Sequence, residues 1–201
     1  MRTVVVTGFS AFPGAPQNPT ARLMTRLARH ARRLARLGWR LETRVLPVVY
    51  GETAGRLAEI ETALRPDVLL HFGLAGRRRA ISVEQVARRR LSPLKVDTAR
   101  QAPRAPMRDG PEALRVRLPV ARLVAAVRAA GAPCAISMDA GGYVCNQTLY
   151  LSLAHSRAAR VGFIHVPRIA RVAGGLGGLE RAALAALFVL LSDAPRHGAA
   201  H

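Results

Sequence analysis

Short runs of β-branched and apolar residues alternate with amphipathic stretches along almost the whole chain, and this alternation limits the folds open to it. Runs such as TVVVTGF (residues 3–9) and DVLLHFGL (residues 67–74) predict buried strands of a parallel sheet. The first helix is expected over residues 18–38, with Asn18 as its N-cap. Strands that alternate with helices predict an α/β fold, here a three-layer α/β/α sandwich with a mostly parallel, twisted central sheet.

The remaining predicted elements continue this order. The 201 residues are enough for one well-buried domain, so we expect a single domain over residues 1–201. Residues 92–119 carry five prolines without clear periodicity, which indicates a long loop or a short β excursion. Residues 194–201 are expected to form a disordered tail. Further strands are predicted over residues 40–49, 134–140 and 160–166, and further helices over residues 52–66, 118–131, 145–158 and 178–194.

The beginning of the chain and its longest apolar run bear on its location. MRTVVVTGF runs directly into a strand-like segment, without the apolar region and cleavage site of a signal peptide. The run AALAALFVLL (residues 182–191) is too short to span a bilayer and predicts a buried helix. We therefore expect a cytoplasmic protein that does not bind membranes.

The formal net charge of +19 raises the question of nucleic-acid binding. Lys95 is the only lysine, and the arginines are spread over the whole chain rather than gathered in a tail. Aromatic residues are scarce, and none of the usual recognition modules is visible. This distribution indicates a compositional bias, and nucleic acid is not expected to be a partner.

The chain has two cysteines, Cys134 and Cys145, which are expected to be reduced thiols. No other cysteine or histidine cluster gives the spacing of metal ligands, so no metal site is predicted. Cys145 follows the turn DAGGYV, where a strand ends and a helix begins. Unpaired N–H groups at a helix start lower the pKa of a thiol and favour a nucleophilic thiolate. The alternative is a small buried hydrophobic residue.

A thiol nucleophile needs a base, and His165 is the best placed of the six histidines. It lies near the end of the strand GFIHV, and Cys145 is expected at the same carboxyl edge of the sheet. His155 follows Cys145 by nearly three helical turns, and His71 is inside an apolar strand where it suits a hydrogen-bonded core position. Glu84, an isolated carboxylate in ISVEQVA, is a candidate to orient the imidazole, although a surface glutamate fits the same pattern.

Four separated segments resemble one family of cysteine exopeptidases, pyroglutamyl peptidase I (pyrrolidone-carboxylate peptidase). VTGFSAFPGAPQNPT is similar to its amino-terminal signature, and FGLAGRRRAISVEQVA is similar to the segment that carries its catalytic glutamate. AISMDAGGYVCNQTLYLSL is similar to the nucleophile segment, and GFIHVP to the histidine segment. The resemblance runs from about Val4 to Pro167, with a gap between Arg88 and Pro119.

The resemblance implies a function and assigns roles to individual residues. It makes Cys145 the nucleophile, His165 the general base and then acid, and Glu84 the partner that orients His165. The implied reaction removes an amino-terminal pyroglutamyl residue from peptides through an acyl-enzyme, without a metal or an organic cofactor. The family also implies a homo-oligomer, either a dimer or a tetramer. The residues that it implies in substrate binding are Phe9, Phe12, Asn18, Tyr143 and Val144.

The segment after Glu84 departs from the family pattern. The family carries an arginine near the reacting carbonyl, whereas Leu94 stands in that register here, with Lys95 and Arg100 as possible replacements. Two other readings therefore stay open beside the peptidase. One is a divergent enzyme that acts on another amino-terminal cap or small amide. The other is a non-catalytic scaffold that binds a peptide or a protein partner.

Overall fold

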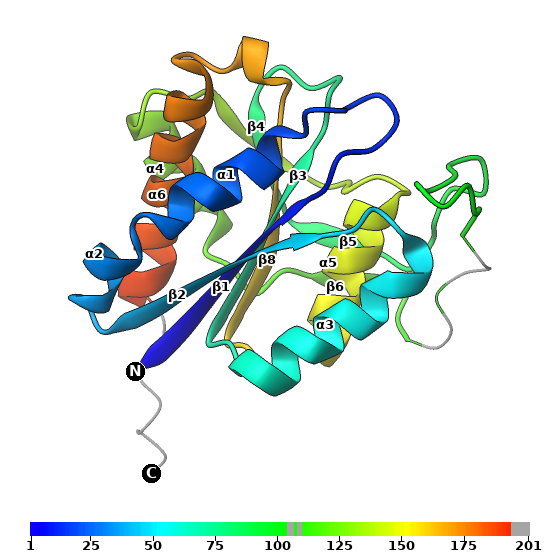
Figure 1. Ribbon diagram of the computed structural model, residues 1–201, viewed down its shortest axis with the longest axis horizontal. Coiled ribbons are helices and arrows are strands. Elements are labelled where there is room, and N and C mark those ends of the chain that lie inside the picture. The colour runs from blue at the N-terminus through cyan, green and yellow to red at the C-terminus, as the bar shows by residue number, and fades with distance from the viewer. Residues whose placement is uncertain (104–106, 108–109, 194–201) are drawn as a thin grey trace.

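The computed structural model describes residues 1–103, 107 and 110–193, so the tail predicted over residues 194–201 lies outside the described residues. A six-stranded sheet forms the middle layer, with helices on both of its faces (Figure 1). The prediction of an α/β fold with a mostly parallel sheet is confirmed. The strands follow the order β2 (Trp39–Leu46), β1 (Arg2–Phe9), β3 (Val68–Leu74), β8 (Arg160–Val166), β4 (Ile81–Glu84) and β7 (Cys134–Ser137).

The sheet changes direction once. Strands β2, β1, β3 and β8 run parallel to one another, whereas β4 runs antiparallel to β8 and parallel to β7. The carboxyl ends of β7 and β8 therefore lie at opposite ends of the sheet. Contrary to the expectation, the strand that precedes Cys145 does not end at the carboxyl edge of β8. The turn after β7 nevertheless brings the sulfur of Cys145 to that edge, beside Gly73, the register partner of His165 on β3.

The first helical region is two helices rather than the single helix predicted over residues 18–38. Helix α1 (Pro19–Ala28) begins with Asn18, whose side chain accepts a hydrogen bond from the backbone N–H of Thr20. Helix α2 (Ala31–Ala35) is separated from it at His30, which has φ −88° and ψ 2°. His30 leaves the helical conformation and its ring meets Glu180 at 2.9 Å, a tertiary contact that the helical pattern does not show.

Two hydrophobic cores lie on the two faces of the sheet. Helices α1, α2, α4 (Val120–Ala129) and α6 (Gly175–Asp193) cover one face, and α3 (Tyr50–Leu64) and α5 (Val144–His155) cover the other (Figure 1). By length and composition alone, Gly175–Ser192 is apolar enough to cross a membrane. Within the fold, the side chains of Leu179, Leu187 and Leu190 on this helix are buried in the first core.

Residues 92–119 contain a short β excursion, which is one of the two alternatives predicted for them. Strand β6 (Ala113–Arg115) pairs with β5 (Val86–Arg88) in a separate two-stranded sheet beside α5 (Figure 1). Before it, residues 92–98 return to the face covered by α5, where the backbone N–H of Ser92 bonds to the carbonyl of Gly142 at 2.9 Å. This segment therefore borders the turn that leads to Cys145.

A short 3₁₀ helix, η1 (Ile169–Arg171), follows β8.

Candidate active site

Three elements bring Glu84, His165 and Cys145 to one face of the sheet. His165 on β8 is the register partner of Gly73 on β3 and of Ser82 on β4. Alternate residues of a strand share a face, so Glu84 lies on the same face as Ser82 and His165. Cys145 is in the first turn of α5, the helix that covers this face. The three residues that sequence reasoning selected therefore lie on one face of the sheet although they come from distant parts of the chain.

Glu84 and His165 form a buried hydrogen-bonded pair. The Nδ1 of His165 lies 2.7 Å from the Oε1 of Glu84, and the two residues are 4% and 0% exposed. A carboxylate accepts only, so Nδ1 carries the proton of the neutral ring and the lone pair is on Nε2. The alternative of a surface glutamate is wrong, because the Glu84 side chain is completely buried.

Cys145 packs against the sheet next to His165. The sulfur lies 2.9 Å from the position that a Cβ on Gly73 would occupy, and the Phe163 ring lies 2.6 Å from that position. Gly73 therefore leaves the space that the sulfur and the Phe163 ring share. Because Gly73 is the register partner of His165, the thiol lies over the strand pair that carries the imidazole.

Burial dominates the ionisation of Cys145. It raises the pKa of the thiol to about 12, and the negative charge of Glu84 acts in the same direction. The backbone N–H of Cys145 and the charges of Lys95 and Arg78 lower the pKa by less. The prediction of a thiol with a depressed pKa is wrong for the free protein, because the loss of water around the sulfur outweighs the helix start.

The imidazole of His165 is also held neutral. Burial lowers its pKa, although the hydrogen bond and the charge of Glu84 raise it. A neutral thiol therefore lies on the same sheet face as a neutral ring, and because Glu84 takes Nδ1, the basic atom of that ring is Nε2. This arrangement suits a general base that removes the proton as the thiol attacks.

Aromatic side chains gather beside this group. The ring of Phe9 lies 6.1 Å from that of Phe163, and the ring of Phe12 lies 6.4 Å from that of Tyr143. Tyr143, which precedes α5, also meets Tyr50 edge to face at 5.7 Å. Phe12 and Tyr143 keep part of their surface exposed, whereas Phe9 and Val144 are buried. Apolar rings thus border the turn that carries Cys145.

Asn18 supports the loop that carries Phe12. Its side-chain amide donates to the carbonyl of Ser10 at 3.0 Å, and its side-chain oxygen accepts from the backbone and hydroxyl of Thr20. Asn18 is buried, and both the oxygen and the nitrogen of its side-chain amide are hydrogen-bonded within the protein. The structure assigns it to loop and helix-cap hydrogen bonds.

The segment that departs from the family pattern supplies a different cation. Leu94 is 91% exposed to solvent. The charge of Lys95 acts on the thiol of Cys145, whereas Arg100 is not among the groups that do so. The carbonyl of Lys95 accepts from the hydroxyl of Tyr50 at 2.9 Å, which holds this segment over Tyr143.

Sequence reasoning missed one group near the site, Arg78, and correctly described another, His71. Arg78 donates to the Oε1 of Glu84 at 2.5 Å, but in the run RRR it looks like one of several solvated arginines. His71 lies on the same sheet face and bonds Thr7 at 2.7 Å and Ser152 at 3.0 Å. The expectation of a hydrogen-bonded core histidine is confirmed for His71. The position of Gly73, two residues later, could have marked the close approach of another group.

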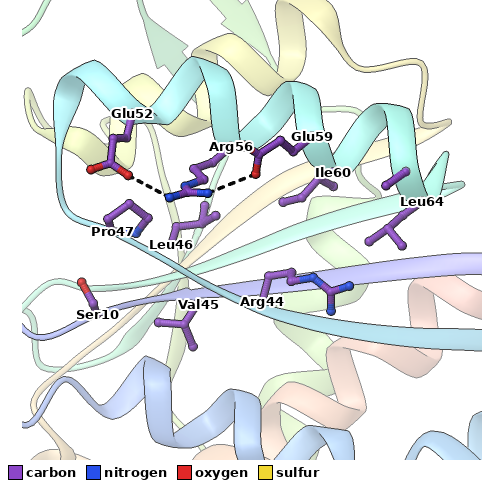
Figure 2. A pocket seen from close by; sticks show the side chains of 11 residues that line it. Ser10, Arg44, Val45, Leu46, Pro47, Glu52, Arg56, Glu59, Ile60 and Leu64 are labelled. Atoms are coloured by element: carbon purple, nitrogen blue, oxygen red, sulfur yellow. Dashed lines mark hydrogen bonds and ion pairs between the residues drawn. The ribbon is translucent and has the colours of Figure 1, made fainter.

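A cavity of about 510 Å³ lies away from these residues, between the edge strand β2 and helix α3 (Figure 2). Arg56 of α3 reaches into it between Glu52 and Glu59, with an N–O distance of 3.2 Å to each (Figure 2). Leu46, Ile60 and other apolar side chains form its floor. It contains neither Cys145 nor His165 nor Glu84.

Within the described ranges, no group of three or more His, Cys, Asp or Glu side chains could hold a metal ion. The groups around Cys145 and His165 are instead arranged for hydrogen bonding and proton transfer.

Comparison with known families gives one match that covers most of the chain. A family profile described as "Pyroglutamyl peptidase" matches residues 2–179. "Pyrrolidone-carboxylate peptidase 1" of Ralstonia nicotianae is 37% identical over 188 residues, which cover 87% of this chain and 82% of the relative. "Pyrrolidone-carboxylate peptidase" of Escherichia fergusonii is 34% identical, and the alignment covers 100% of both chains.

Solved structures agree with this match. A mutant pyrrolidone carboxyl peptidase from Pyrococcus furiosus superimposes with a TM-score of 0.85 at 29% identity, over 96% of this chain and 100% of that one. The pyrrolidone carboxyl peptidase from Thermus thermophilus gives a TM-score of 0.81 at 31% identity, over 93% of this chain and 100% of that one. The α/β fold with its six-stranded, mostly parallel sheet is therefore shared with these enzymes.

Proposed function

This chain belongs to the pyroglutamyl peptidase family of cysteine peptidases, and we propose that it removes the amino-terminal pyroglutamyl residue from peptides, with Cys145 as its nucleophile. The observation that carries the assignment of residues is the 2.7 Å hydrogen bond between Glu84 and His165 on the sheet face that Cys145 also covers. This is a Cys-His-Glu arrangement in which a base activates the thiol and a carboxylate orients the base.

Acylation begins with transfer of the Cys145 proton to the Nε2 of His165. The sulfur attacks the pyroglutamyl carbonyl carbon, and the carbonyl oxygen takes up the negative charge. The backbone N–H of Cys145, in the first turn of α5, is directed at the reacting centre and stabilises that charge. His165 then gives its proton to the leaving nitrogen, the C–N bond breaks, and the shortened peptide departs.

Deacylation repeats these steps with water. His165 takes a proton from water, and the oxygen attacks the thioester carbonyl. The C–S bond breaks, the sulfur recovers the proton from His165, and 5-oxoproline leaves. Glu84 keeps the ring in the required tautomer and compensates its positive charge each time His165 is protonated.

The aromatic side chains supply a site for the flat lactam ring. Phe12 and Tyr143 offer apolar faces, and they pack against the core cluster that contains the buried Phe9 and Val144. A neutral five-membered ring gains from such faces, while backbone groups recognise its amide. Asn18 contributes by fixing the loop that carries Phe12. Lys95 adds a positive charge near the thiol and thus near the developing oxyanion.

Release of a fluorophore from a pyroglutamyl amide tests the function. A prolyl amide and the Cys145→Ala protein are assayed beside it. Cleavage of the pyroglutamyl amide alone, and only by the protein that carries Cys145, is the expected result. Cleavage of neither amide by a folded protein would contradict the proposed activity and favour a different cap or a non-catalytic scaffold.

We further propose that the enzyme works in the cytoplasm and forms a homo-oligomer, a dimer or a tetramer. Two thiols, one of them needed for the reaction, suit a reducing compartment. Fractionation of cells tests the first proposal. Light scattering coupled to size exclusion tests the second, and a mass of 21.6 kDa for the particle in solution would contradict it.

A further inference from the structure

Arg78 links two parts of the active site that approach it from different elements. Its Nη1 donates to the Oε1 of Glu84 at 2.5 Å, the same oxygen that meets the Nδ1 of His165. Its Nη2 donates to the carbonyl of Asp139 at 2.7 Å and to the hydroxyl of Ser137 at 3.1 Å. One guanidinium therefore touches both the carboxylate that orients the base and the turn that leads to the nucleophile.

Arg78 adds a link from Glu84 to the turn after β7, which also has hydrogen bonds of its own. Residues 138–143 must carry the chain from β7 to the start of α5. Within the turn, the backbone N–H of Gly141 bonds to the side chain of Asp139 at 2.8 Å, and the hydroxyl of Ser137 bonds to the carbonyl of Asp139 at 3.2 Å. Arg78 joins this turn to Glu84, and the position of Cys145 follows from where the turn ends.

Glu84 needs a cation because it is completely buried. Burying a carboxylate without a partner is costly, and its second oxygen, Oε2, has no hydrogen-bond partner among the described residues. Neutral His165 offers one hydrogen bond but no charge. The guanidinium of Arg78 is thus the group that compensates the carboxylate while His165 waits unprotonated.

The loop that carries Arg78 is itself held in place. The guanidinium of Arg171, just after β8, donates to the backbone carbonyls of Gly76, Arg77 and Arg78 at 3.1 to 3.2 Å. Arg77 and Arg79 are exposed, whereas Arg78 is partly buried and points to Glu84. Of the three consecutive arginines, the fold therefore directs only the side chain of Arg78 toward Glu84 in the described structure.

We propose that Arg78 is a positioning residue of the hydrolysis, which holds Glu84 as the charged partner of His165 and ties the Cys145 turn to that same carboxylate. This inference rests on the proposed peptidase function. Arg78 acts through Glu84 and the turn, so it should influence turnover more than the binding of the pyroglutamyl ring.

The pH dependence of kcat/KM distinguishes this role from a purely structural one, because Arg78 is one of the charged groups that set the pKa of His165. Glu84 from β4 and Asp139 from the turn after β7 raise the pKa of His165, and Arg78 lowers it. The thiol of Cys145 on α5 is neutral near pH 7. Removal of Arg78 should therefore move the acidic limb of kcat/KM to higher pH, because protonated His165 becomes easier to form.

Arg78→Ala, Arg78→Lys and Arg56→Ala are compared with the wild type on the pyroglutamyl amide. Arg78→Ala should lower kcat about 100-fold, near the lower end of what acid–base catalysis contributes, with little change in KM. Its acidic limb should move to higher pH, and added guanidinium ion should restore part of the rate. Arg56 also bridges two acceptors but lies in the cavity beside β2 (Figure 2), so Arg56→Ala should match the wild type in rate and pH profile.

Arg78→Lys keeps the charge but lacks the fork that reaches Glu84 and Asp139 together. It should keep the wild-type acidic limb and lose about tenfold in kcat, because the turn is no longer tied to the carboxylate. Wild-type kcat in Arg78→Lys, or a rate loss in Arg78→Ala with an unmoved limb, would overturn the inference. An inactive wild type would instead overturn the proposed function, which separates the two failures.

Discussion

The Nδ1 of His165 lies 2.7 Å from the Oε1 of Glu84, across the only antiparallel strand pair of the six-stranded sheet in the described structure. The pair comes from positions 81 residues apart in the chain. It is buried, and it leaves Nε2 as the basic atom of the ring.

Replacement of Glu84 by Gln should lower kcat by about 10² to 10⁴-fold while the protein stays folded. The amide can accept a hydrogen bond from Nδ1 but cannot compensate the charge of protonated His165, and it leaves Arg78 without a buried anion. Steady-state kinetics on the pyroglutamyl amide measure the loss. Activity equal to that of the wild type would show that Glu84 does not orient the base.

Replacement of Cys145 by Ala or Ser should abolish hydrolysis, with a loss of at least about 10⁴-fold, because neither side chain supplies the thiol that forms the acyl-enzyme. The other cysteine gives a matched control. Cys134 is buried on β7, and burial raises its pKa to about 11, so Cys134→Ala should keep nearly full turnover. Comparable activity in Cys145→Ala would rule out the thiol mechanism.

The acidic limb of kcat/KM should fall below the ordinary histidine pKa of about 6.5. Burial lowers the pKa of His165, so the ring stays neutral and basic as the pH falls through 6.5 and is protonated only at lower pH. Activity is therefore retained at neutral pH and lost in acid. A pH series of kcat/KM measures the limb, and a limb well above 6.5 would mean that Glu84 outweighs burial.

His71 should make the fold less stable in acid. Burial lowers its pKa to about 3, so the unfolded chain takes up a proton below pH 6.5 that the folded protein refuses. The free energy of unfolding should fall by up to about 1.4 kcal/mol per pH unit from this group. Urea titrations at pH 7 and 4.5 test this, and the fall should be smaller in His71→Gln, which remains neutral. Equal falls in the two proteins would argue against a buried neutral His71.

Replacement of Gly73 by Ala should damage both stability and turnover. Its Cβ would lie 2.6 Å from the Phe163 ring and 2.9 Å from the sulfur of Cys145, so one of them must move. We expect a loss of about 1–3 kcal/mol in the free energy of unfolding and a lower kcat. Gly55→Ala is the control, because Gly55 is an exposed residue of α3 and no atom would lie within 4 Å of the new Cβ. A wild-type kcat in Gly73→Ala would mean that the sulfur has room to shift without consequence.

The sequence predicted the layers of this fold because strands and helices differ in periodicity and length. It did not predict the reversal at β4 and β7, since four-residue strands carry no signal for their direction. The break between α1 and α2 was missed for a related reason. His30 leaves the helix to meet Glu180, a residue 150 positions away, and local pattern does not reveal such contacts.

The site was predicted unevenly. Cys145, His165 and Glu84 were selected from their positions at strand and helix ends and from resemblance to one family. The pKa of Cys145 was predicted in the wrong direction, because the helix start is visible in sequence whereas the burial of the sulfur is not. Arg78 was missed because its neighbours Arg77 and Arg79 are identical in type. Only the folded loop distinguishes the arginine that meets Glu84.

The place of β8 has a consequence for the order of events during synthesis. This strand spans residues 160–166 and lies between β3 and β4, which are made far earlier. Until β8 has left the ribosome, β4 and β7 have no neighbour that joins them to β3, and Glu84 has no imidazole to orient. Strands β2, β1 and β3 can pair without β8, but the union of the two parts of the sheet and the completion of the Glu84–His165 pair both wait for it.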